Sequence, residues 1–149
     1  MTGQRLTWGD RVRYWPNLSN DNHSITSPAT DNYNCIAWAY EVSNKSMWPG
    51  YPDYYWPSDV TGRDELRTLI QLYLNKGYEE CENGQQEDGF KKVAIYVNQE
   101  GPTHAARQLE SGRWTSKLGI LVDIEHDTLE ALEGEFYGKA AVFLRKRNV

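Results

Sequence analysis

The chain has 149 residues and a formal net charge of −5, with a pI near 5.2. This acidic balance argues against a nucleic-acid backbone as the main partner, and no apolar run approaches the roughly 18 residues of a membrane span. Hydrophobic residues make up 39% of the chain and charged residues 25%, so we expect one soluble globular domain over residues 1–149. The first residues lack the apolar run of a signal peptide, and we therefore expect a cytoplasmic protein.

The first half of the chain predicts two helices separated by a loop. Residues 1 to about 30 are polar and contain two prolines, which predicts an irregular lead-in. Residues 34–43 place apolar side chains at helical spacing after cap-forming residues, which predicts the first helix. Three prolines and a glycine between residues 47 and 57 predict an ordered aromatic loop. The second helix is predicted over about residues 63–76 and is closed by Gly77.

The second half of the chain shows the alternating, β-branched pattern of strands. A short helix is predicted among them at residues 128–133, with Asp127 as its cap. Helices followed by mainly sequential strands predict an α+β fold in which N-terminal helices pack on a mainly antiparallel sheet. The predicted strands are residues 78–81, 92–98, 103–109, 114–118 and 136–144, the third and fourth forming a hairpin.

Cys35 stands where a polar, cap-rich run meets the apolar run of the first predicted helix. In the first turn of a helix the dipole favours the thiolate, which is the nucleophilic form of cysteine. Asn32 or Asn34 can cap this helix, and either could donate a hydrogen bond to an oxyanion together with the Cys35 amide. The alternative is a small buried cysteine that packs beside Trp38 on the same helix face.

His104 begins the second strand of the predicted three-strand meander, after a Gly-Pro turn. A histidine at the end of a sheet can reach the N-terminus of a helix that packs on it. A Cys–His pair within hydrogen-bond distance is the minimum apparatus for nucleophilic catalysis. The alternative is a structural histidine that binds a backbone carbonyl.

The residue that would orient the His104 imidazole is open between Ser116 and Asp123. An odd number of residues in the hairpin loop turns Ser116 toward the face of His104, whereas an even number turns Lys117 there. Asp123 is the better electrostatic partner for a histidine, and Glu125 and His126 close behind it are further alternatives. The run from Asp123 to His126 can also be only a turn.

Trp114 and Lys117 flank this candidate site and would contact a substrate if a cleft exists. The alternatives are core packing for the indole and a solvated edge charge for the lysine. Zinc would suit the two cysteines together with His104 and His126, but no pair of these residues has the close spacing that prepares half a metal site. We therefore expect no metal and no cofactor, and two free thiols at Cys35 and Cys81.

The order of these elements resembles the papain-like fold of NlpC/P60-type cysteine peptidases over about residues 31–118. In that family the histidine strand reads His, an apolar run, a Gly-containing turn, a basic residue, an aromatic residue, an apolar residue and a polar third catalytic residue, and HAARQLESGRWTS at residues 104–116 follows that spacing. Two positions differ from the family: Ile36 follows the cysteine in place of a small residue, and Ser116 replaces the usual His, Asn, Asp or Gln. The runs YNCIAWA, KVAIYV, THAARQL and GRWTSKLG are also similar to an uncharacterised bacterial family without an assigned activity.

Two hypotheses on function follow. The first is a cysteine hydrolase or acyl transferase that acts on an amide or thioester bond of a peptide or small amide. Cys35 would be its nucleophile, His104 its base and then its acid, and Ser116 or Asp123 its orienting residue. The second is a non-catalytic interaction module, toxin-like or regulatory, that keeps the fold and binds a protein partner through its aromatic surface. Neither hypothesis involves nucleic acid or a membrane.

Overall fold

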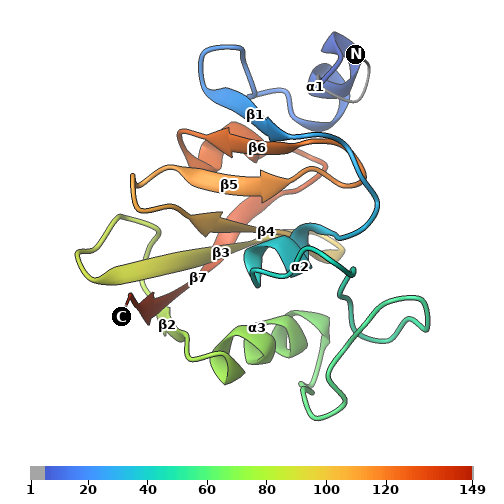
Figure 1. Cartoon of the computed structure of the whole chain (residues 1–149), viewed down its shortest axis with the longest axis vertical. Coiled ribbons are helices and arrows are strands. Elements are labelled where there is room, and N and C mark those ends of the chain that lie inside the picture. The colour runs from blue at the N-terminus through green and yellow to red at the C-terminus, as the bar shows by residue number, and fades with distance from the viewer. Residues whose placement is uncertain (1–5, 149) are drawn as a thin grey trace.

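The structure is a computed structural model that describes residues 6–148 (Figure 1). Within these residues seven strands form one antiparallel sheet in the order β1-β6-β5-β4-β3-β7-β2. The chain thus has an α+β fold. The strands are β1 (His23–Ser27), β2 (Glu79–Cys81), β3 (Phe90–Asn98), β4 (Gly101–Gln108), β5 (Trp114–Lys117), β6 (Asp123–His126) and β7 (Lys139–Arg147). The helices are α1 (Trp8–Tyr14), α2 (Cys35–Ala39), α3 (Glu65–Asn75) and the short 3-10 helix η2 (Leu129–Leu132).

Helices α2 and α3 confirm the two helices that the sequence predicts. The side chain of Asn34 accepts a hydrogen bond from the Ala37 amide and so caps α2. This helix ends earlier than predicted, because the backbone turns at Glu41, which has a φ of 68°. The Val42 amide then donates to the Ala37 carbonyl, which is the closing bond of a Schellman motif.

Outside these helices the structure differs from the sequence predictions and their alternatives in several places. The lead-in is not irregular, because a capping box at Thr7 starts α1 and residues 23–27 form the edge strand β1. The run from Asp123 to His126 is no turn but the strand β6, which lies between β5 and β1. Thr128 caps η2 in place of Asp127, and β7 begins only after the turn that joins Gly134 to Gly138.

Alternate residues of the strands face two separate clusters of buried side chains. Helices α2 and α3 cover one side of the sheet, called here the α2 face, while η2 and the N-terminal segment cover the other, called the η2 face. The α2 face includes Tyr33, Ile36, Leu69, Tyr73, Val93, Ile95 and Ala105. The η2 face includes Trp15, Ala94, Tyr96, Ala106, Trp114, Ile124, Leu132 and Tyr137.

The ladder between β4 and β5 is short. It consists of the pairs Arg107–Thr115 and Gln108–Trp114 and does not continue to the first half of β4. That first half also carries a bulge, because Tyr96 of β3 pairs with His104 and the next residue pairs with Pro102. The start of β4 therefore lacks a partner strand on its β5 side, close to the point where α2 crosses it in Figure 1.

In the part of the chain that the structure describes, no helix has both the length and the apolar character needed to cross a bilayer.

Candidate functional site

Three buried side chains on the η2 face form a continuous hydrogen-bonded chain. The Nε2 atom of His104 lies 2.9 Å from the Ser116 hydroxyl oxygen, which lies 2.8 Å from the Nε2 atom of His126. The Nδ1 atom of His126 lies 2.8 Å from the Thr128 carbonyl oxygen. All three side chains are fully buried. We call this set, which comprises His104, Ser116 and His126, the histidine relay.

Aromatic packing fixes the ring of His104. Tyr137 stacks on it with ring centroids 4.2 Å apart and planes 11° apart, and Tyr96 lies edge-on at 5.3 Å. Burial holds the pKa of His104 well below its usual range, and burial also lowers the pKa of His126 to about 4. Both imidazoles are therefore neutral near pH 7. Among the described residues, the Nδ1 atom of His104 is buried without a hydrogen-bond partner.

The thiol of Cys35 lies at the start of α2 on the opposite side of the sheet. Its sulfur is 4.0 Å from the Thr103 carbonyl oxygen. Burial raises the pKa of the Cys35 thiol to about 11, although the backbone amides of Ala105, Ile36 and Cys35 itself favour the thiolate. The resting cysteine is therefore a protonated thiol.

The structure brings Cys35 to the backbone on both sides of His104, but not into a hydrogen bond with its ring. The sulfur contacts Thr103 and Ala105, the two chain neighbours of His104. The ring itself points to the η2 face, because alternation along β4 sends Ala105 toward α2 and His104 away from it. Within residues 6–148, no hydrogen bond joins the thiol to the imidazole. The sequence predicted a preformed dyad, and in this conformation its two members are adjacent but unpaired.

Ser116 contacts His104, and Asp123 does not. Gln108 pairs with Trp114, so an odd number of residues separates the paired strands and Ser116 shares the face of His104. Asp123 lies on the α2 face, where its carboxylate accepts a hydrogen bond from the Tyr33 hydroxyl. This corrects the expectation that Asp123 could orient the imidazole, because β6 directs its side chain to the other side of the sheet.

Two side chains that were expected to contact substrate are buried. Trp114 belongs to the core of the η2 face, and Lys117 is fully enclosed on the α2 face, with its ammonium donating to the Leu121 carbonyl. Neither side chain presents surface to a ligand. The expected role is thus corrected for both, since β5 is an interior strand covered on both faces.

Two further predicted residues hold α2 in place. The Asn34 side chain caps the helix through its oxygen, which also accepts from the Met47 amide, and its NH2 group donates to the Met47 carbonyl. The indole of Trp38 donates to the Thr115 hydroxyl at 3.0 Å and stacks on Tyr33. These bonds tie α2 to Met47 and to β5.

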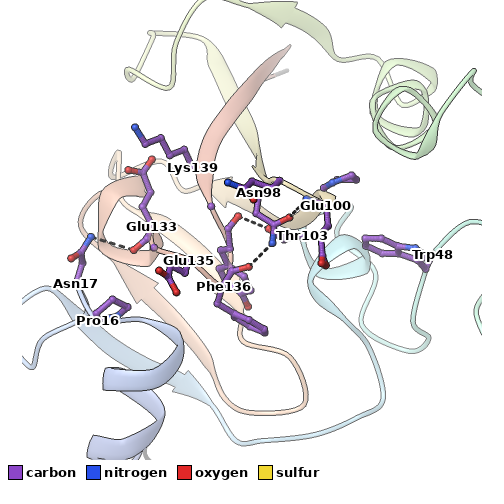
Figure 2. Close-up of a pocket in the computed structure, with 15 residues that line it drawn as sticks. Pro16, Asn17, Trp48, Asn98, Glu100, Thr103, Glu133, Glu135, Phe136 and Lys139 are labelled. Atoms are coloured by element: carbon purple, nitrogen blue, oxygen red, sulfur yellow. Dashed lines mark hydrogen bonds between the residues drawn. The ribbon is translucent and has the colours of Figure 1, made fainter.

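A groove of about 1060 Å³ runs past the end of β4 at which His104 lies. In Figure 2, Trp48 lies at one end of the groove and Asn17 at the other, with Thr103 between them. The hydroxyl of Thr103 donates to the Tyr137 carbonyl at 2.6 Å and so ties the start of β4 to the turn before β7. Three glutamates and one lysine line the groove, which is therefore acidic: Glu100, Glu133, Glu135 and Lys139.

Sequence reasoning missed two parts of this arrangement. It weighed His126 as an alternative orienting residue and as a zinc ligand, whereas in the structure His126 is the next member of the same relay. The available signal was the alternation of Ile124 with polar neighbours, which is the pattern of a strand. Tyr137 was also missed, and nothing in the sequence indicates that it stacks on His104.

Comparison with known proteins gives one match. Neither the curated proteins nor the solved structures contain a match to this chain. Residues 24–145, which run from β1 into β7 and include the histidine relay and Cys35, match a family described as a domain of unknown function, DUF7689. Because this match covers most of the sequence, the chain belongs to the DUF7689 family.

Proposed function

We propose that this chain is a cysteine hydrolase or acyl transferase of papain-like architecture that acts on an amide or thioester bond. The observation that carries the proposal is the Nδ1 atom of His104, which is buried without a partner and belongs to the residue whose backbone neighbours contact the Cys35 thiol. A buried nitrogen without a hydrogen bond is costly, and such atoms concentrate where a reaction uses them.

The proposed reaction begins from a neutral pair. The Cys35 thiol leaves the Thr103 carbonyl and turns into the open part of the β4–β5 ladder, toward the Nδ1 atom of His104. His104 accepts the thiol proton while the sulfur forms a bond to the substrate carbonyl carbon. The C–N or C–S bond then breaks, and His104 returns the proton to the leaving group. Water, or another acceptor nucleophile, finally releases the acyl group from the sulfur.

The raised pKa of Cys35 and the lowered pKa of His104 both fit this scheme. Their directions disfavour a resting thiolate–imidazolium pair, so the proton transfers only when the sulfur attacks. The backbone amides of Cys35, Ile36 and Ala105 favour the charged form of the thiol, so they would stabilise the negative charge that develops on the sulfur. The groove supplies an approach for the substrate, because Thr103 and Tyr137 line it and both adjoin His104.

A trapping experiment tests the proposal. The protein is incubated with p-nitrophenyl acetate, an activated acyl donor, and acetylated peptides are identified by mass spectrometry. We expect a burst of p-nitrophenolate and an acetyl adduct on Cys35. Both should be absent in Cys35→Ala and reduced roughly 10²–10⁴-fold in His104→Ala. The matched control is Cys81→Ala, which removes the other free thiol and should change neither signal.

The opposite result would overturn the proposal. If Cys35 is acetylated no faster than Cys81, and His104→Ala changes neither rate in a folded protein, then His104 does not act on the thiol. The interaction module would then be the better account. Its support is the loop between α2 and α3, where the rings of Tyr51, Tyr54 and Tyr55 are exposed.

A further inference from the structure

We propose that His126 is a positioning residue that determines, through Ser116, which nitrogen of His104 carries the proton. The inference rests on the proposed function for its catalytic consequence. The tautomer itself can be measured in the absence of any substrate, so the two ideas can fail separately.

The argument starts at the far end of the histidine relay. The Thr128 carbonyl oxygen can only accept a hydrogen bond, so the Nδ1 atom of His126, 2.8 Å away, must carry a proton. Because His126 is buried and neutral, its other nitrogen has no proton. The Nε2 atom of His126 is therefore an acceptor.

The direction of the Ser116 hydroxyl proton in turn determines which nitrogen of His104 is protonated. A serine hydroxyl has one proton, and the Nε2 atom of His126 requires it. The hydroxyl oxygen then has only lone pairs to offer to the Nε2 atom of His104, 2.9 Å away. For this contact to be a hydrogen bond, the Nε2 atom of His104 must carry the proton.

The remaining nitrogen of His104 is thereby fixed as a base. A neutral imidazole has one proton, so the Nδ1 atom keeps a free lone pair, and this is the atom without a partner. Ring flipping is opposed by the stack on Tyr137 and the edge contact with Tyr96. The Thr128 carbonyl thus determines which nitrogen of His104 is the acceptor. It does so through the side chains of His126 and Ser116.

Nuclear magnetic resonance tests the tautomers directly. In protein labelled with ¹⁵N-histidine, long-range ¹H–¹⁵N spectra near pH 7 distinguish protonated from unprotonated ring nitrogens. We expect His104 to be protonated at Nε2 and His126 at Nδ1. A wild-type His104 protonated at Nδ1 would overturn the inference, and this result needs no variant to fold.

The substitution His126→Phe keeps a ring of similar size and removes the acceptor. The Ser116 proton is then free to turn toward His104, so we expect a measurable fraction of His104 to become protonated at Nδ1. The matched control is His23→Phe, since His23 lies opposite His126 on β1 but outside the relay. An unchanged His104 tautomer in folded His126→Phe would contradict the proposed role.

The catalytic consequence is a separate readout. With the acyl donor above, His126→Phe should lower kcat at least roughly tenfold and leave KM nearly unchanged, because the groove is untouched. Unchanged kcat in a variant whose tautomer has shifted would refute the catalytic part of the inference. If the wild-type protein forms no Cys35 adduct, the proposed function fails while the tautomer assignment stands on its own spectra.

Discussion

The two faces of the sheet solve the burial of polar groups differently. On the η2 face, three neutral groups of the histidine relay satisfy one another in a chain that ends on the Thr128 carbonyl. On the α2 face, the ionisable Asp123 and Lys117 are enclosed, with the Tyr33 hydroxyl donating to the carboxylate and the ammonium donating to the Leu121 carbonyl. The α2 face thus buries ionisable groups. On the η2 face, the hydrogen bonds of the histidine relay determine which ring nitrogens carry protons.

This difference shows why the proposed chemistry is divided between the two faces. A thiol that develops negative charge benefits from the Lys117 cation, which favours the charged form of Cys35. A base whose tautomer must be fixed benefits from a neutral relay instead. The open part of the β4–β5 ladder is the one place in residues 6–148 where we propose that the two sides act on each other.

The largest expected effect comes from the turn that carries Tyr137. Gly138 has a φ of +78°, and a Cβ atom there would collide with the Val97 carbonyl. Gly138→Ala should displace the ring that stacks on His104. It should lower the free energy of unfolding, measured by urea denaturation, by about 3–5 kcal/mol. The control is Gly89→Ala, at a φ of +81° with open space around it, which should cost only about 1 kcal/mol. Equal losses would show that the turn does not support the η2 face.

The next effect is a loss of stability in acid that originates on the η2 face. Unfolded histidine has a pKa near 6.5, whereas burial lowers the pKa of His126 to about 4. As pH falls between these values, the unfolded chain binds a proton that the folded chain refuses. Stability is therefore complete above about pH 6.5, and His126 alone removes about 3 kcal/mol by about pH 4.

The α2 face should respond to pH with the opposite sign. Burial raises the pKa of Asp123, so the folded state binds this proton more tightly, and the contribution of Asp123 weakens as pH rises through the range of carboxyl groups. Urea denaturation as a function of pH measures the contributions of both His126 and Asp123 to stability. His126→Phe should flatten the slope between about pH 6.5 and 4, and an unchanged slope would show that the relay does not titrate as described.

A smaller loss should follow from removing the partner of Asp123. Tyr33→Phe deletes the hydroxyl that donates to this carboxylate, whose second oxygen already lacks a hydrogen bond among the described residues. We expect a loss of about 1–3 kcal/mol in unfolding free energy. The exposed Tyr51→Phe is the control and should be neutral. Because Tyr33 is on the α2 face, the His104 tautomer should not change, and a change would couple the two faces more closely than proposed.

The smallest effect should come from the bond that holds α2 on β5. Thr115→Val is nearly isosteric and removes the hydroxyl that accepts from the Trp38 indole at 3.0 Å. Its cost should be about 1 kcal/mol by thermal or urea unfolding. The exposed Thr61→Val serves as the control. If the bond positions α2, Thr115→Val should also alter the acetylation rate of Cys35. An unaltered rate would show that the bond contributes to stability only.

Much of the fold could be predicted from local signals. Asn34, one of the two asparagines expected to cap the first helix, caps α2, and Asp64 caps α3 close to the predicted start of the second helix. A cap depends only on the next three residues. The strand β6 was missed because it has only four residues, although its alternation was a strand signal and its partner β5 is close in sequence. The strand β1 was missed because it has five residues and pairs with β6, about 100 positions away. No local pattern records such a pairing.

The sequence predicted which residues belong to the candidate site better than it predicted how they are arranged. Loop parity left Ser116 and Lys117 as alternatives on the face of His104, because the side-chain period of a strand is two, and the odd loop in the structure selects Ser116. The same period also sends His104 away from α2, and this consequence depends on which face the helix covers. The burial of Trp114 and Lys117 likewise depends on β5 being an interior strand, which only the completed sheet determines.

The pairing of β1 with β6 also affects when this part of the sheet can form during synthesis. Ser24 pairs with Glu125, so the first strand to leave the ribosome adjoins a strand that is made about 100 residues later. At about 5–20 residues per second, β1 remains without its neighbour for roughly 5–20 s of synthesis. Its alternately exposed, serine- and threonine-rich sequence, HSITS, is poorly suited to pairing with other chains during that interval. The strand that waits longest for its neighbour is thus also one that is poorly suited to pairing with other chains.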